Sequence, residues 1–177
     1  IKDDPLPEAY NDLSLVHKAD YLRTYFMHHH GGGYADIKTY PNSWVEAFDQ
    51  LENSDAYALG YKEVGWWGVA NQTITEEPLK GDLEIYWRYL IGNCAYICRP
   101  YTKFTAEWYA ETKKRVLEKA DLLKENSASN DNPFNTNKNY PIDWSYILGA
   151  VFHPLCLKYN KRLLYNNNIK PIFKDYR

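Results

Sequence analysis

The sequence lacks any apolar run long enough to cross a membrane, and its mean hydropathy is −0.64. A membrane-spanning helix needs about 20 consecutive apolar residues, so we expect no membrane span within these 177 residues. The sequence also lacks an excess of either charge, because 21 Lys and Arg are balanced by 23 Asp and Glu. Nucleic-acid-binding domains carry clustered positive charge, so we expect no nucleic-acid partner.

Cysteine is scarce, with Cys94, Cys98 and Cys156 as the three copies. Three cysteines cannot all pair within one chain, and neither a CxxC nor an HxxxH spacing occurs, which argues against a zinc site. We expect reduced core residues in a reducing, cytoplasmic compartment. The sequence begins at Ile1, and the Golgi lumen is the alternative location if an N-terminal anchor precedes it.

Aromatic residues are abundant, at 16% of the chain with 17 Tyr and 6 Trp. Their flat apolar faces with a polar tip suit stacking on bases and sugars. A tyrosine-rich core and rim is an equally good explanation. The pair Trp66–Trp67 beside Gly65 and Gly68 is accordingly either a stacking platform for an acceptor sugar or a packed core pair.

Periodicity and turn residues predict alternating helices and strands. Leu15, Ala19, Leu22 and Phe26 recur at helical spacing, with Asp12 or Ser14 as the cap and Gly31 as the end of the helix. Further helices are predicted at 44–51, from Thr102 or Thr105 to 124, and at 143–157, with a long loop at 126–139. Strands are predicted at 33–37, 55–61, 66–70 and 93–98 and in the tail after 163. This order predicts a single α/β domain over 1–177.

The most informative stretch is residues 17–40, HKADYLRTYFMHHHGGGYADIKTY. Asp20 and Arg23 are three residues apart on the predicted helix and therefore share one face. The carboxylate accepts hydrogen bonds from sugar hydroxyls, and the guanidinium donates to hydroxyl or phosphate oxygens. The pair can therefore bind a polyhydroxylated ligand. A plain surface ion pair is the alternative.

A glycine run, Gly31 to Gly33, follows the helix and allows close backbone approach to a ligand. Asp36 then stands at the carboxyl end of a predicted strand, where ligands bind in open α/β sheets. A carboxylate there can reach a divalent metal whose shell is completed by diphosphate and water. The alternative for Asp36 is an ordinary turn residue.

Together, HKxDxxR, an apolar helix, GGxY and the following Asp resemble the DXD-motif family of sugar transferases. That family includes yeast-type mannosyl chain initiators, capsular polysaccharide transferases and, more distantly, clostridial glucosylating toxins. The segments IGNCAYICRP (91–100) and DWSYILGAVFHPL (143–155) are similar to its Asn-containing strand and C-terminal donor region. The resemblance implies a GT-A-type, Rossmann-like mixed central sheet flanked by helices. The strand that usually holds the donor base would lie before Ile1.

The resemblance also implies residue roles. Asp20 and Arg23 would contact the transferred sugar, Tyr34 would shape the nucleotide pocket, and Asp36 would bridge donor ribose and metal. Asn93 would bond the donor or satisfy nearby backbone groups.

Two residues of the C-terminal region have alternatives. His153 would reach the metal or the diphosphate, as a late His does in similar enzymes, or it is a buried structural residue. Asp143 would act as general base if the reaction inverts the anomeric centre, or it caps a helix. Enzymes with this motif mostly retain the anomeric configuration.

The sequence departs from the pattern at Lys38, which stands where the second acid of DXD would be. An ammonium cannot ligate a metal. Either Asp36 alone holds the metal with diphosphate oxygens and water, or Lys38 replaces part of the metal charge and neutralises the diphosphate directly. We expect the first, with weakly held Mn²⁺ or Mg²⁺.

The expected function is hexose transfer from a UDP-sugar or GDP-sugar to a glycan or protein hydroxyl, as in polysaccharide biosynthesis. The catalytic residues would be Asp20, Arg23 and Asp143. Two alternatives are a non-catalytic domain that binds nucleotide sugars or carbohydrate, which Lys38 favours, and a nucleotidyltransferase-like enzyme on a similar sheet.

Overall fold

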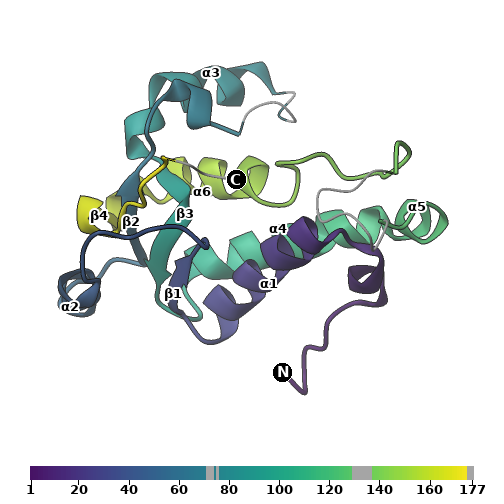
Figure 1. Ribbon diagram of the computed structural model, residues 1–177, viewed down its shortest axis with the longest axis horizontal. Coiled ribbons are helices and arrows are strands. Elements are labelled where there is room, and N and C mark those ends of the chain that lie inside the picture. The colour runs from purple at the N-terminus through teal and green to yellow at the C-terminus, as the bar shows by residue number, and fades with distance from the viewer. Residues whose placement is uncertain (71–73, 75, 129–136, 175–177) are drawn as a thin grey trace.

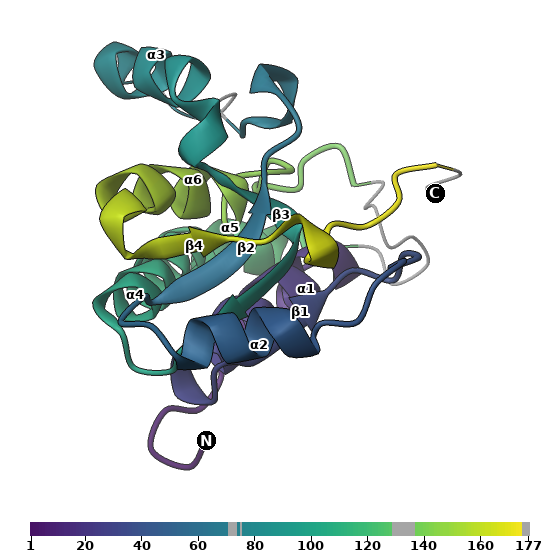
Figure 2. The same cartoon turned by 90° about the vertical axis from the view of Figure 1, so that its left-hand side faces the viewer.

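The computed structural model describes residues 1–70, 74, 76–128 and 137–174. It has one mixed four-stranded sheet with helices on both faces (Figures 1 and 2). The strands are β1 (Gly32–Ala35), β2 (Ala58–Lys62), β3 (Ile91–Cys98) and β4 (Leu163–Tyr165), in the order β1-β3-β2-β4. The pairs β1–β3 and β2–β3 are antiparallel, and β2–β4 is parallel. The predicted α/β class is confirmed, while a GT-A arrangement remains a prediction.

The helices form two unequal layers around this sheet. They are α1 (Leu15–His29), α2 (Val45–Glu52), α3 (Glu77–Ile85), α4 (Lys103–Glu118), α5 (Ala120–Glu125) and α6 (Gly149–Lys158). Side chains alternate between the faces of a strand. On β3, Tyr96 and Cys98 pack with residues of α1, α4 and α6, whereas Ile97 packs with residues of α2. The larger core therefore lies on the α1–α4–α6 side.

Helix α1 begins and ends where the sequence predicts. The Ser14 side chain accepts the backbone N–H of His17 at 3.2 Å, and the helix stops two residues before Gly31. Its apolar stripe is not its buried face, however: Leu15 and Phe26 are 55% and 47% exposed, but Asp20 and Arg23 are only 2% and 9% exposed. The acid–guanidinium pair points into the protein and is not a surface ion pair.

Three predicted elements differ from the structure, one helix is missing from the prediction, and one predicted loop is described only in part. Residues 66–70 form no strand, because Gly68 N–H bonds Gly65 C=O and closes a 3₁₀ turn at Trp66–Gly68. The helix predicted from 143 begins only at Gly149, and the helix predicted to 124 is interrupted at Lys119 between α4 and α5. Helix α3 was not predicted. In the predicted loop 126–139, residues 129–136 lie outside the described residues.

Within the described part of the chain, no helix is both long enough and apolar enough to cross a lipid bilayer. The three cysteines are free thiols: Cys98 and Cys156 are buried in the larger core, whereas Cys94 is half-buried. The expectation of reduced core residues therefore holds for two of the three.

The turn from α1 into β1 depends on Gly31. Its φ is +65°, and an added Cβ would lie 2.6 Å from Cδ of Pro100 and 2.7 Å from the carbonyl oxygen of Cys98. We predict that Gly31→Ala lowers the free energy of unfolding by about 3 kcal/mol, from a left-handed backbone and a steric clash together.

Gly32→Ala is the matched control. Gly32 also has a positive φ, +87°, but its added Cβ would meet nothing within 4 Å. Gly32→Ala should lower the free energy of unfolding by only about 1 kcal/mol, because only the cost of a left-handed backbone remains. Chemical denaturation measures both values, and equal losses in the two variants would refute the close approach at Gly31.

Candidate functional site

A cavity of about 700 Å³ opens where α1, the end of β1, the middle of β3 and the start of α6 meet. Residues from five separate stretches of sequence line it. These are Leu15, Val16, Ala19, Asp20, Arg23, Tyr34, Ala35, Asp36, Ile37, Lys38, Trp67, Gly68, Val69, Ala70, Asn93, Cys94, Trp144, Ser145, Leu148 and Gly149.

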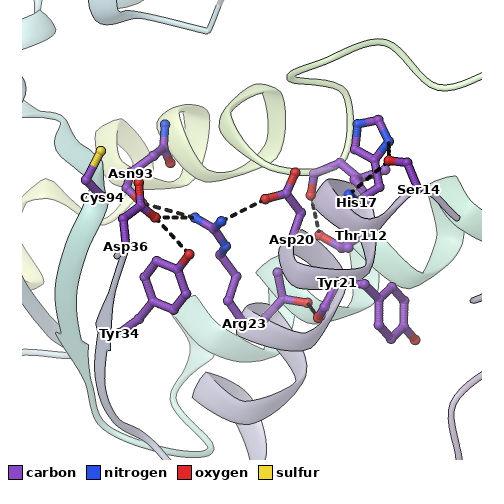
Figure 3. A network of polar contacts seen from close by, with 12 residues as sticks. Ser14, His17, Asp20, Tyr21, Arg23, Tyr34, Asp36, Asn93, Cys94 and Thr112 are labelled. Atoms are coloured by element: carbon purple, nitrogen blue, oxygen red, sulfur yellow. Dashed lines mark hydrogen bonds and ion pairs between the residues drawn. The ribbon is translucent and has the colours of Figure 1, made fainter. Parts of the chain in front are cut away.

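The guanidinium of Arg23 lies at the centre of the site's polar network (Figure 3). Its Nη2 is 2.9 Å from Oδ1 of Asp20, and its Nη1 is 4.0 Å from Oδ1 of Asp36. Nη1 also donates to the backbone carbonyl of Asn93 at 3.1 Å, and the group lies 4.1 Å from the centre of the Tyr34 ring. One cation thus joins α1, the end of β1 and β3.

Asp20 is the more deeply buried of the two acids. Burial raises the pKa of Asp20 to about 6, against the lowering effect of Arg23. Above that pH the carboxylate is ionised and can accept hydrogen bonds from hydroxyl groups.

Asp36 follows β1 directly and is held on both carboxylate oxygens. The Tyr34 hydroxyl donates to Oδ1 at 2.8 Å, and the Lys38 ammonium forms an ion pair with Oδ2. Burial favours the neutral acid, but Lys38, Tyr34 and Arg23 outweigh it and keep the pKa of Asp36 below its usual value. Asp36 is therefore an anion held between two cations.

Two residues that the sequence reasoning missed hold this segment in place. The Tyr40 hydroxyl donates to the carbonyl oxygens of both Asp36 and Cys94, and the Cys94 thiol accepts from Lys38 Nζ at 3.3 Å. The sequence did contain a signal that Tyr34, Asp36 and Lys38 belong together. They are spaced two residues apart, and in an extended chain side chains at that spacing lie on the same side. Nothing comparable in the sequence indicated Tyr40 or Cys94.

Asn93 forms part of the cavity wall, and His153 supports it from behind. His153 is fully buried within α6, and the backbone N–H of Ala70 donates to its Nδ1 at 3.1 Å. Its Nε2 is 3.1 Å from the side-chain amide nitrogen of Asn93 and 3.7 Å from a Glu63 carboxylate oxygen. Burial lowers the pKa of His153 to about 4, so the ring is neutral near pH 7. This position matches the buried structural alternative.

Asp143 is not brought to the site. It is exposed and does not line the cavity, although its neighbours Trp144 and Ser145 do. The cap alternative is wrong, because α6 begins at Gly149 with Leu148 at the cap position. The general-base role has no support in this geometry.

The residues present fit a divalent metal poorly. Such an ion needs about six oxygen ligands, whereas Asp36 offers two oxygens that already bind Tyr34 and Lys38. In the parts of the chain that the structure describes, no group of three or more His, Cys, Asp or Glu side chains could hold a metal ion. The metal site remains a prediction from the resemblance, and the geometry favours the alternative in which Lys38 supplies the charge.

Comparisons with models of protein families, with curated proteins and with solved structures found no match. The resemblance to DXD-motif transferases therefore depends on the residues of this chain alone. All six predicted donor-site residues line the cavity: Asp20, Arg23, Tyr34, Asp36, Lys38 and Asn93. The predicted general base Asp143 and metal ligand His153 do not.

The neutral state of His153 has a consequence for acid stability. The pKa of His153 is about 4 in the folded protein and 6.5 in the unfolded chain. The contribution of the neutral ring to the free energy of unfolding is therefore complete above pH 6.5. That contribution is lost as the pH falls from 6.5 to 4, because only the unfolded chain then binds the proton. The loss approaches about 1.4 kcal/mol per pH unit. We predict that His153→Gln lowers stability at pH 7 but flattens this pH dependence by about one proton.

Denaturation at several pH values between 4 and 7 measures the effect, with the exposed His30→Gln as the control. His17, whose pKa burial also lowers to about 4, and Asp20 are unchanged in both variants and cancel in the comparison. Parallel curves for wild type and His153→Gln would contradict the prediction.

Proposed function

We propose that this protein is a glycosyltransferase that moves a hexose from a nucleoside-diphosphate sugar to a hydroxyl acceptor. The observation that carries the proposal is the convergence of Asp20 and Arg23 from α1 with Asp36 from the end of β1 on one cavity. These residues lie on different elements, so a helix-surface ion pair does not account for them. Paired acids and cations in a cavity of this size suit a ligand with both hydroxyl and phosphate groups.

In the proposed step, the bond between the sugar C1 and the diphosphate oxygen breaks, and its electron pair leaves with the diphosphate. C1 then bonds to the acceptor oxygen, and the released hydroxyl proton passes to solvent. Asp20 would accept hydrogen bonds from sugar hydroxyls, while Arg23 would donate to sugar or phosphate oxygens. Holding the ring against the acceptor supplies orientation, which is a large part of catalysis.

The developing charge on the diphosphate must be neutralised for the bond to break. Arg23 and Lys38 are the two cations that line the cavity, and Asp36 lies between them. In this proposal Asp36 positions both cations and accepts from the donor's ribose. The same arrangement would also suit a domain that binds a donor but does not turn it over. The experiments below distinguish this non-catalytic alternative from the transferase.

The mouth of the cavity supports a sugar acceptor. Trp67 and Trp144 line it and are 70% and 62% exposed, and Trp66 packs edge-on against Trp67. Exposed tryptophans at the rim of a polar cavity offer flat surfaces on which sugar rings stack. We therefore assign the acceptor side to these two rings and the donor side to Asp20, Arg23 and Asp36.

The first test is turnover. Purified protein should release nucleoside diphosphate slowly from a UDP-hexose or GDP-hexose, because water can replace the acceptor. Asp36→Asn should lower this rate by roughly 100-fold, since it removes the charge that positions both cations. The exposed Asp49→Asn on α2 should leave the rate unchanged.

Proton NMR of the sugar anomers and chromatography of the nucleotide follow the reaction. Undiminished turnover in Asp36→Asn would refute the assignment. Donor binding by calorimetry without any turnover would favour the non-catalytic domain, and reaction only with nucleoside triphosphates would favour a nucleotidyltransferase.

The second test separates acceptor from donor. Trp67→Ala should raise the KM for an oligosaccharide acceptor about 10-fold, from one lost stacking surface, while hydrolysis of the donor in water stays unchanged. Tyr86→Ala, which removes an exposed ring at the end of α3 that does not line the cavity, is the control. Equal losses of transfer and hydrolysis in Trp67→Ala would place this ring on the donor side instead.

A further inference from the structure

We propose that the Lys38 ammonium takes the place of a divalent metal and binds the donor diphosphate directly, so that donor binding needs no metal. This inference rests on the proposed function, since it concerns the donor of that reaction. It begins from what Lys38 contacts. Its side chain is only 2% exposed, and its Nζ is paired with Oδ2 of Asp36 and lies 3.3 Å from Sγ of Cys94.

A buried ammonium must be paired to be tolerated. Lys38 meets this condition, because its ammonium forms an ion pair with Oδ2 of Asp36. The site thus holds a permanent positive charge against the single acid where a metal would bind.

The charges lining the cavity support the same conclusion. Asp20 and Asp36 are opposed by Arg23 and Lys38, the four charged residues of the described lining, so the sum is zero. An acid at position 38 would give three negative charges against one positive, a deficit of two. One Mn²⁺ or Mg²⁺ would offset that deficit. With Lys38 present, an added divalent ion would leave an excess of two positive charges and would be repelled at short range.

The hydrogen-bond chemistry also suits a phosphate. A lysine ammonium has three donors, and the sulfur of Cys94, 3.3 Å from Nζ, is a weak acceptor. A phosphate oxygen is a far stronger acceptor and can take this donor without breaking the pair with Asp36. Arg23 lies on the other oxygen of the same carboxylate. Both cations therefore reach the region where the diphosphate of a donor would lie.

The experiment is isothermal titration calorimetry with UDP and GDP, in excess EDTA and in excess Mn²⁺. Wild type should bind the preferred nucleotide with the same Kd, within about 2-fold, under both conditions. Lys38→Met should weaken binding roughly 10- to 100-fold in both, because one charge-assisted hydrogen bond is lost. Lys124→Met, an exposed site on α5, is the control.

Lys38→Asp is the sharper variant because it should create the metal dependence that wild type lacks. Its nucleotide binding should disappear in EDTA and return with Mn²⁺. Titration with Mn²⁺ alone, followed by electron paramagnetic resonance, should show tighter binding to Lys38→Asp than to wild type. Thermal melts confirm that each variant is folded. The comparison of wild-type binding in EDTA and in Mn²⁺ tests the inference even if a variant does not fold.

Two results would overturn this inference while leaving the proposed function intact. One is wild-type nucleotide binding that requires Mn²⁺, and the other is Mn²⁺ that binds wild type as tightly as Lys38→Asp. Absence of UDP and GDP binding to wild type under both conditions is a different outcome, because it would overturn the proposed function itself and this inference with it.

Discussion

The buried guanidinium of Arg23 is the interaction on which the site depends. It joins the acid of α1, the acid that follows β1 and a backbone carbonyl of β3. Without it, two carboxylates would face one another in a mostly enclosed space, which is among the least favourable arrangements in a protein interior. The guanidinium therefore both assembles the cavity and keeps its acids ionised. In the function that we propose, the same residue would serve both stability and ligand recognition.

Much of the fold could be predicted because local signals agreed with tertiary packing. Ser14 and Gly31 mark the beginning and the end of α1, and β3 has the apolar pattern of a strand buried on both faces. One of the failures has a clear physical cause. Residues 66–70 look like a strand, but they find no neighbouring strand to pair with and close a turn instead. Apolar periodicity alone does not reveal whether a partner strand is available.

The site was predictable where the chemistry is local and not where it depends on distant contacts. The spacing of Asp20 and Arg23 correctly placed both on one face of α1, and the resemblance to the transferase motif correctly grouped them with Tyr34, Asp36 and Lys38 at one cavity. The sequence could not show which face of α1 is buried, because that depends on the distant residues against which Tyr21, Tyr25 and Met27 pack. The enclosure of His153 follows from its bond to Ala70, more than 80 positions earlier.

The sheet is completed by its last strand. Strand β4 pairs in parallel with β2, with Ala58 opposite Leu163, so one edge of β2 stays unpaired until residues 163–165 join the sheet. An open edge of apolar strand is a template for pairing with other chains. Contacts between such distant positions also slow folding. A chain in which residues 163–165 have not yet joined the sheet therefore exposes an edge of β2 to which a second chain can pair.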